Sequence, residues 1–422
     1  GISIMLIFVV SFILLPSVLS YLPVPGKRQL TYLDNRWITG MLDKIENWVF
    51  HHKNKVIITV AAVLVFSVAG MFRLKSVAYI VDDLPKTDKI YTDLKFFERN
   101  FRGVMPLEIV VDSKKRKGLR GLKPFYKVDT LASFIAGFSE MNRPLSLSEG
   151  LKFATMGFNE NDSNAYRMPG DFEAVFLNDY LSGKGTSGGN GLSKMLSSFI
   201  DTSKRYTRIS VNMADVGTEK LPMLVDSIRN RANAIFDTTY NVTITGTSIT
   251  FQEGSRFIIS GLKESIFWAF LLIALCMLYL FRSVRILICS LLPNLIPLIV
   301  TAGIMGWAGV PLKPSTVLIF SVALGIAVDI TIRFLVNYRQ VLPFHHNDIA
   351  LTVRSTVRQT GLSIIYTSLV LTAGFVIFCA SSFGGTFALG WLTSVTLITA
   401  TITNLVFLPV LLLVFRKRGE DK

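Results

Sequence analysis

The chain has 422 residues, of which 50% are hydrophobic and 17% charged, and its mean hydropathy is +0.48. This balance excludes an ordinary soluble protein and predicts several membrane spans. The formal net charge of +15 is typical of basic flanks beside membrane spans, and we expect no nucleic-acid partner because no basic-aromatic stripe or nucleic-acid motif accompanies it.

The first three segments alternate between apolar runs and a polar linker. Residues 1–22 are apolar and are interpreted as the last span of a preceding bundle that begins upstream. Residues 23–54 are a cytoplasmic linker, and residues 55–73 are the next span. The linker contains a helical apolar repeat, which predicts an amphipathic helix lying in the membrane interface with its tryptophans at headgroup level. The repeat consists of Leu33, Trp37, Met41, Ile45 and Trp48.

Residues 74–256 have mixed charges and no long apolar run, which predicts a domain outside the membrane. Alternating β-branched segments predict strands at 106–112, 207–213 and 241–245. Helical patterns cover 127–141 and 218–236, the second with Thr218 as its N-cap. Helices and strands therefore alternate, which predicts an inserted α+β domain of the split βαβ, ferredoxin-like kind.

Residues 257–415 predict a bundle of five spans, followed by a basic cytoplasmic tail at 416–422. Uncharged runs cover 265–281, 286–312, 314–328 and 359–415, and the last run is long enough for two spans. The short loops on one side of the membrane carry the arginines, namely Arg282, Arg285, Arg339 through Arg358, and Arg416 and Arg418. The positive-inside rule assigns that side to the cytoplasm and residues 74–256 to the opposite side.

This layout resembles the C-terminal half of a transporter of the resistance-nodulation-division superfamily. The segment SVALGIAVDITIRF, residues 321–334, is similar to the fourth span of that half, with Gly325 and Asp329 at the G-x-x-x-D motif. Residues 281–312, which contain Pro293, Asn294 and Pro297, resemble the linked second and third spans. The nearest branch is that of the hydrophobe and lipid exporters, the MMPL and Patched-like group. The chain is thus expected to be an α-helical polytopic membrane protein.

The resemblance also implies partners and a location. It implies a non-enzymatic, homo-oligomeric transporter in the bacterial inner membrane, with residues 74–256 in the periplasm. The proton gradient would supply energy, so no cofactor and no metal are expected. A first half is implied as well, either in the same chain or in a partner chain. The transported molecule would be a lipid or another hydrophobic small molecule.

Asp329 is the strongest candidate for a functional residue. A charged carboxylate at the centre of a span costs at least about 2.5–3.5 kcal/mol, and a carboxyl group shielded from water prefers its neutral form. Asp329 is therefore interpreted as a proton relay, whose protonation would shift the helices at the interface between the two halves. Gly325 and Ser321 lie on its face of the helix, where small residues let a neighbouring helix approach closely. The alternative is a structural ion pair between Asp329 and Arg333, four residues later.

The hydroxyl groups of the following span are secondary relay candidates. Ser363, Tyr366 and Thr367 would carry protons or polarise Asp329, whereas such residues more often bond to their own helix backbone. Asn294 is expected to satisfy backbone carbonyls freed by the flanking prolines. The residues give no assignment for substrate binding.

Three functions are compatible with this reading. The first is a proton-driven exporter of lipids or other hydrophobic molecules. The second is an accessory subunit of the Sec protein-export machinery, which shares the superfamily bundle. The third is a non-transporting lipid- or sterol-sensing module, whose lipid binding would not depend on Asp329.

Overall fold

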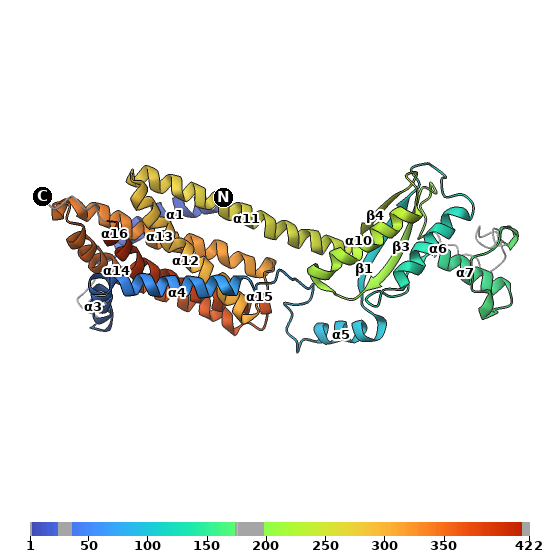
Figure 1. Cartoon of the computed structure of the whole chain (residues 1–422), viewed down its shortest axis with the longest axis horizontal. Coiled ribbons are helices and arrows are strands. Elements are labelled where there is room, and N and C mark those ends of the chain that lie inside the picture. Colours follow the sequence, from blue (N-terminus) through green and yellow to red (C-terminus); the bar gives the residue numbers. More distant parts are fainter. Residues whose placement is uncertain (1, 24–35, 174, 176–197, 416–422) are drawn as a thin grey trace.

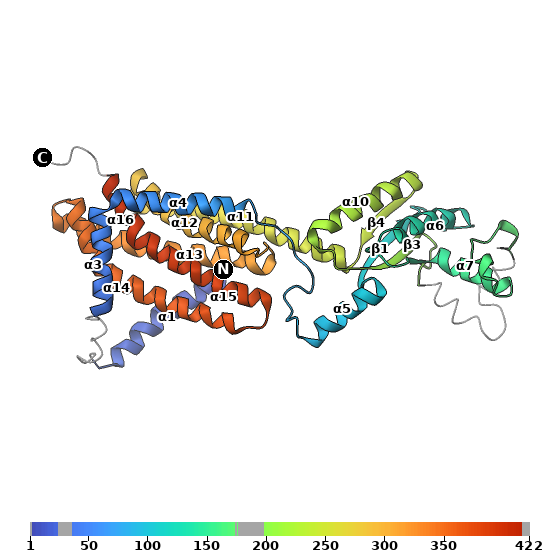
Figure 2. The same cartoon turned by 60° about the horizontal axis from the view of Figure 1, so that its bottom comes forward.

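The computed structural model describes residues 2–23, 36–173, 175 and 198–415. The molecule is elongated, with a helical bundle at one end and an αβ unit at the other (Figure 1). The expected basic tail at 416–422 and Leu33 of the linker repeat lie outside the described residues. The bundle and the αβ unit meet at the ends of α4 and α12 and at the middle of α11 (Figures 1 and 2).

Seven of the described helical segments are long and apolar enough to cross a membrane, which confirms a polytopic helical membrane protein. Their helices are α1 (Ile2–Tyr21), α4 (Lys53–Met71), α11 (Thr247–Phe281), α12 (Val284–Ala308), α13 (Pro314–Val341), α14 (Ile349–Val376) and α15 (Gly384–Ile402). Short turns η3 (Leu342–His345) and η4 (Ile377–Ala380) extend α13 and α14, and a π-helical turn η5 (Thr403–Phe407) joins α15 to α16 (Leu408–Val414).

The helix α11 connects the αβ unit directly to the bundle. It has 35 residues and runs from Thr247 to Phe281 without interruption. The domain boundary expected between residues 256 and 257 therefore falls inside a continuous helix. Only the second half of α11 forms the uncharged run that the sequence analysis assigned to a span.

The helix α3 (Arg36–His51) packs on the bundle rather than standing apart from it. Its buried side chains are Ile38, Leu42 and Val49, and these belong to the same core as α14 and α16. Trp37 and Trp48 lie off this packed side and are 83% and 52% exposed, so their place at headgroup level stays a prediction. The helix is apolar on two sides, and only the tryptophan side was recognised from the sequence.

The αβ unit is built on a four-stranded sheet in the order β2-β3-β1-β4. Its strands are β1 (Met105–Asp112), β2 (Leu145–Ser146), β3 (Tyr206–Met213) and β4 (Asn241–Thr245). The strand β1 is central and antiparallel to both neighbours, and Ile109 lies opposite Ile209 and Ile244. The three predicted strands are thus confirmed to within one residue, whereas the two-residue β2 was not predicted.

Two helices cover one face of this sheet, α6 (Lys123–Ala136) and α10 (Gly217–Ile235). Their apolar sides form one core with the alternating buried residues of β1 and β3. The shorter elements α5 (Lys89–Phe101), α7 (Leu147–Phe158) and the turn η2 (Ser163–Ala165) lie outside this layer. Both predicted helices are present, although α6 begins and ends about four residues earlier than predicted.

The predicted N-cap of α10 was wrong. The helix begins at Gly217, and the cap position is Val216, which has no side-chain cap. The hydroxyl group of Thr218 instead accepts a hydrogen bond from the backbone nitrogen of Ala78 at 3.0 Å. Threonine before a helical pattern is a common cap signal, but here the hydroxyl group is hydrogen-bonded to a distant segment of the chain.

Candidate functional site

Asp329 lies on a face of α13 that the described chain leaves uncovered. Its side chain is 62% exposed and forms an ion pair with Arg333, one helical turn later. The described chain therefore does not shield this carboxylate by itself, and the proton relay stays a prediction. The reason is its position on the helix, because Ala327, Val328 and Ile330 occupy the side that faces the bundle core.

Ser321 and Gly325 precede Asp329 on the same exposed face, as their spacing of four residues predicts. No side chain or neighbouring helix in the described part of the chain lies within 4 Å of the position that a Cβ would take at Gly325. The close helix approach expected there is not made by the described residues. This face thus carries the small residues Ser321 and Gly325, followed by the carboxylate of Asp329 and the guanidinium of Arg333.

The three candidate hydroxyl groups of α14 differ in their burial and in their contacts. Thr367 donates a hydrogen bond to the backbone oxygen of Ser363 at 2.9 Å and lies 3.1 Å from that of Ile364. This is the backbone bonding typical of hydroxyl residues in membrane helices. Ser363 is exposed, and Tyr366 is half-buried and packs against the bundle core. The geometry thus assigns Thr367 to its own helix.

A buried polar cluster lies on the opposite side of α13 from Asp329, and only one of its members, Asn294, is a candidate from the sequence. The hydroxyl oxygen of Thr331 lies 2.7 Å from the amide oxygen of Asn294 and 2.6 Å from that of Asn404. All three side chains are fully buried. The cluster joins α12, α13 and η5 at the centre of the bundle.

The hydrogen-bond donors in this cluster are limited. Each asparagine donates one of its two side-chain amide hydrogens to its own helix, Asn294 to Ser290 and Asn404 to Ala400, both at 2.9 Å. The hydroxyl group of Thr331 carries one hydrogen, so it donates to one amide oxygen at a time. Asn404 sits in a π-helical turn, a feature found often at functional positions. Two asparagines inside otherwise apolar spans were the available sequence signal.

The comparisons with known proteins agree with this architecture. The model of the MMPL family matches residues 177–421, which is more than half of the chain. No curated protein matches the chain. The family match covers α10, β4 and the whole bundle from α11 onward, including the segment that carries Gly325 and Asp329. The resemblance to a half of a resistance-nodulation-division transporter is thereby confirmed, and the chain belongs to the MMPL family of membrane transporters.

Proposed function

We propose that the chain is part of a proton-driven exporter of lipids or other hydrophobic molecules. Family membership supports export of such molecules. The observation that carries the proton-coupling part is Asp329, a carboxylate in the middle of a span that faces away from its own bundle. A charged group at that depth is costly and is usually retained for function.

The uncovered face of α13 supports a further step. Ser321, Gly325 and Asp329 form a stripe on which a second helix bundle fits closely, since small residues allow backbones to approach. We propose that the first half implied by the resemblance, whether in the same chain or in a partner, covers this stripe. Asp329 then becomes buried in the assembly and alternates between pairing with Arg333 and binding a proton.

The arrangement of charges supports an orientation in the membrane. At the end of the bundle far from the αβ unit, arginines lie at the end of α11 and near the starts of α12 and α14, namely Arg282, Arg285 and Arg354 (Figure 1). The positive-inside rule assigns this end to the cytoplasm. We therefore propose that the bundle spans the inner membrane of a bacterium and that the αβ unit lies in the periplasm. Its β1-α6-β2-β3-α10-β4 order, with α7 and η2 inserted between β2 and β3, and its sheet order support a ferredoxin-like topology. We also propose that the transporter is a homo-oligomer. The proton gradient, and not a cofactor, would supply its energy.

The test is substitution of Asp329 in the full transporter. Asp329→Asn keeps the size of the side chain but removes its titration, so we expect export of a fluorescent phospholipid from proteoliposomes to fall at least tenfold. Asp329→Glu should restore part of it. Asp226→Asn, an exposed carboxylate of the αβ unit, is the matched control and should export normally. Undiminished export by Asp329→Asn, with normal folding, contradicts the relay.

A further inference from the structure

Lys313 is a buried cation at the junction between the bundle and the αβ unit. It caps the N-terminus of α13 and is only 8% exposed. Its ammonium nitrogen lies 2.5 Å from a carboxylate oxygen of Asp83 and 3.1 Å from one of Asp82. Burial lowers the pKa of Lys313, but the hydrogen bonds to Asp83 and Asp82 more than offset it, and the pKa is raised. Removing the carboxylates would therefore leave the buried ammonium group of Lys313 without its partners, which is costly for a buried charge.

Asp82 and Asp83 belong to the segment between α4 and α5, residues 72–88, which we call the strap. A second bond ties the strap to the bundle here, because the backbone nitrogen of Gly384 donates to the carbonyl oxygen of Asp83 at 2.9 Å. Gly385 leaves the room that this carboxylate needs, since a Cβ there would lie 3.0 Å from Asp83 Oδ2. The strap is thus held by the first turns of both α13 and α15.

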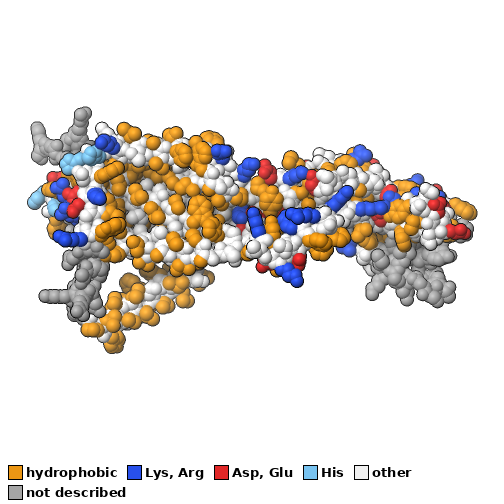
Figure 3. All heavy atoms as spheres, turned by 90° about the horizontal axis from the view of Figure 1, so that it is seen from below, with side chains coloured by type: hydrophobic (Ala, Val, Ile, Leu, Met, Phe, Trp, Pro, Cys, Tyr) orange, Lys and Arg blue, Asp and Glu red, His pale blue; other side chains and the backbone are white. Residues whose placement is uncertain are grey.

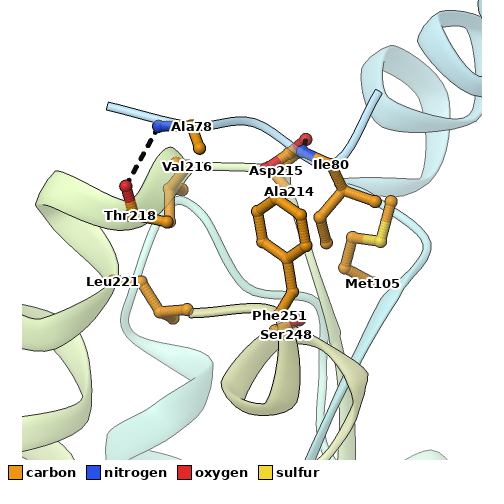
Figure 4. Close-up of a pocket in the computed structure, with 11 residues that line it drawn as sticks. Ala78, Ile80, Met105, Ala214, Asp215, Val216, Thr218, Leu221, Ser248 and Phe251 are labelled. Atoms are coloured by element: carbon orange, nitrogen blue, oxygen red, sulfur yellow. Dashed lines mark hydrogen bonds between the residues drawn. The ribbon is translucent and has the colours of Figure 1, made fainter. Parts of the chain in front are cut away.

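The strap is also bonded to the αβ unit, a few residues before this cluster (Figure 4). The backbone of Ala78 exchanges two hydrogen bonds of 3.0 Å with Thr218, one through its nitrogen and one through its oxygen. The backbone nitrogen of Ile80 donates to the carboxylate of Asp215 at 2.7 Å. Thr218 lies in the first turn of α10 and Asp215 just before it, so this part of the strap is fixed to the helix that covers the sheet.

The helix that begins directly after Lys313, α13, also carries Asp329. The two residues are about 16 positions apart on one continuous helix, which corresponds to ~24 Å at a rise of 1.5 Å per residue. A helix transmits displacement along its length far better than a loop does. A shift of α13 at Asp329 therefore moves Lys313, and the ion cluster moves the strap with it.

We propose that Lys313 is a positioning residue that couples α13 to the αβ unit through its ion pairs with Asp82 and Asp83. The proposal rests on the proposed function, because it assumes that α13 moves when Asp329 changes its proton. It assigns the strap as the path by which that movement reaches α10 and the sheet. Loss of the cluster should therefore uncouple proton movement from export rather than abolish both.

The experiment compares Lys313→Gln, Lys313→Arg and Lys86→Gln in the full transporter in proteoliposomes. Lys86 lies in the same strap and is exposed, so its variant is the matched control. Export of a fluorescent phospholipid and proton flux, followed with an enclosed pH-sensitive dye, are measured together. For Lys313→Gln we expect export to fall at least tenfold while proton flux stays within twofold of the wild type. Lys313→Arg keeps the charge and should recover export.

A second measurement separates this proposal from the proposed function. Hydrogen exchange of the Ile80 and Gly384 amides reports on the bonds of the strap to the αβ unit and to the bundle without any transport. We expect Lys313→Gln to accelerate both at least tenfold, and Lys86→Gln to leave both unchanged. Unchanged exchange, or normal export by Lys313→Gln, overturns the coupling role, as does equal loss of export and proton flux in a folded variant. Normal export by Asp329→Asn overturns the proton relay instead, while the exchange result still decides whether the strap depends on Lys313.

Discussion

Gly70 and Gly306 bring the backbones of α4 and α12 into direct contact, because a Cβ at Gly306 would overlap the carbonyl group of Gly70. One turn away, Gly303 packs against the backbone of Ser67 in the same way. Small residues at this spacing are the usual means by which membrane helices approach closely. The pair α4 and α12 therefore depends on the absence of side chains at these positions.

The first prediction concerns this contact. Gly306→Ala should destabilise the protein by about 1–3 kcal/mol, the usual cost of overpacking, because both neighbouring atoms are backbone and move little. Gly261→Ala is the control, since no atom outside its own helix backbone lies within 4 Å of the added methyl group in the described chain. There alanine should be neutral or stabilising by up to about 1 kcal/mol. Thermal unfolding in detergent measures both, and equal midpoints contradict the prediction.

The second prediction concerns the cluster around Thr331. Thr331→Val keeps the shape of the side chain but removes the hydroxyl group that two buried amide oxygens share. Leaving buried acceptors without a donor costs about 1–3 kcal/mol, so the unfolding midpoint should fall. Thr401→Val is the control, because the half-buried Thr401 donates only to Leu397 of its own helix in the described structure. A variant as stable as this control would show that the cluster contributes nothing.

The third prediction concerns the pH dependence of the αβ unit. Two hydrogen bonds of 2.7 and 2.8 Å from Arg205 to Asp112 hold the pKa of that carboxyl group below its ordinary value. A lowered pKa in the folded state stabilises the fold above the unfolded value of about 3.9, and this contribution is lost as the pH falls below it.

Asp112→Asn removes this contribution at neutral pH but not in strong acid. The difference in unfolding midpoint between wild type and variant should therefore be largest above about pH 5 and shrink toward pH 3. Chemical unfolding of the αβ unit, followed by hydrogen exchange of β1 amides, measures it. A difference that is constant across this range would mean that the ion pair does not act through the charge of Asp112.

The sequence predicts the elements of this fold better than their contacts. Strands β1, β3 and β4 alternate in hydrophobicity because one face of the sheet is buried, so their pattern is local. The spans are likewise local, since length and hydropathy define them. The face that α3 presents to the bundle depends on which of its two apolar sides meets α14, and no periodicity decides between them.

The contacts of the site residues differ in the same way, because some are local in the sequence and others are not. Asp329 and Arg333 are four residues apart, so their ion pair follows from helical spacing. Lys313 and Asp83 are 230 positions apart, and the contact exists only because α13 begins beside the strap. Thr331 and Asn404 meet through a π-helical turn, which shifts the side chains that follow it and has no simple sequence pattern. Contacts of this kind are fixed by tertiary packing alone.

The uninterrupted helix α11 gives the αβ unit a stiff stem. A stem without a hinge lets the unit tilt or rotate about its base but prevents it from drifting freely as it would on a flexible linker. Because the sheet and α7 extend far beyond the junction (Figure 1), a small rotation at the base sweeps a wide arc at the tip. Space-filling atoms show basic side chains gathered around that base (Figure 3), so the pivot lies where the apolar surface of the bundle ends. The stiff stem and the length of the unit would thus place the largest displacement at the tip, farthest from the apolar surface of the bundle.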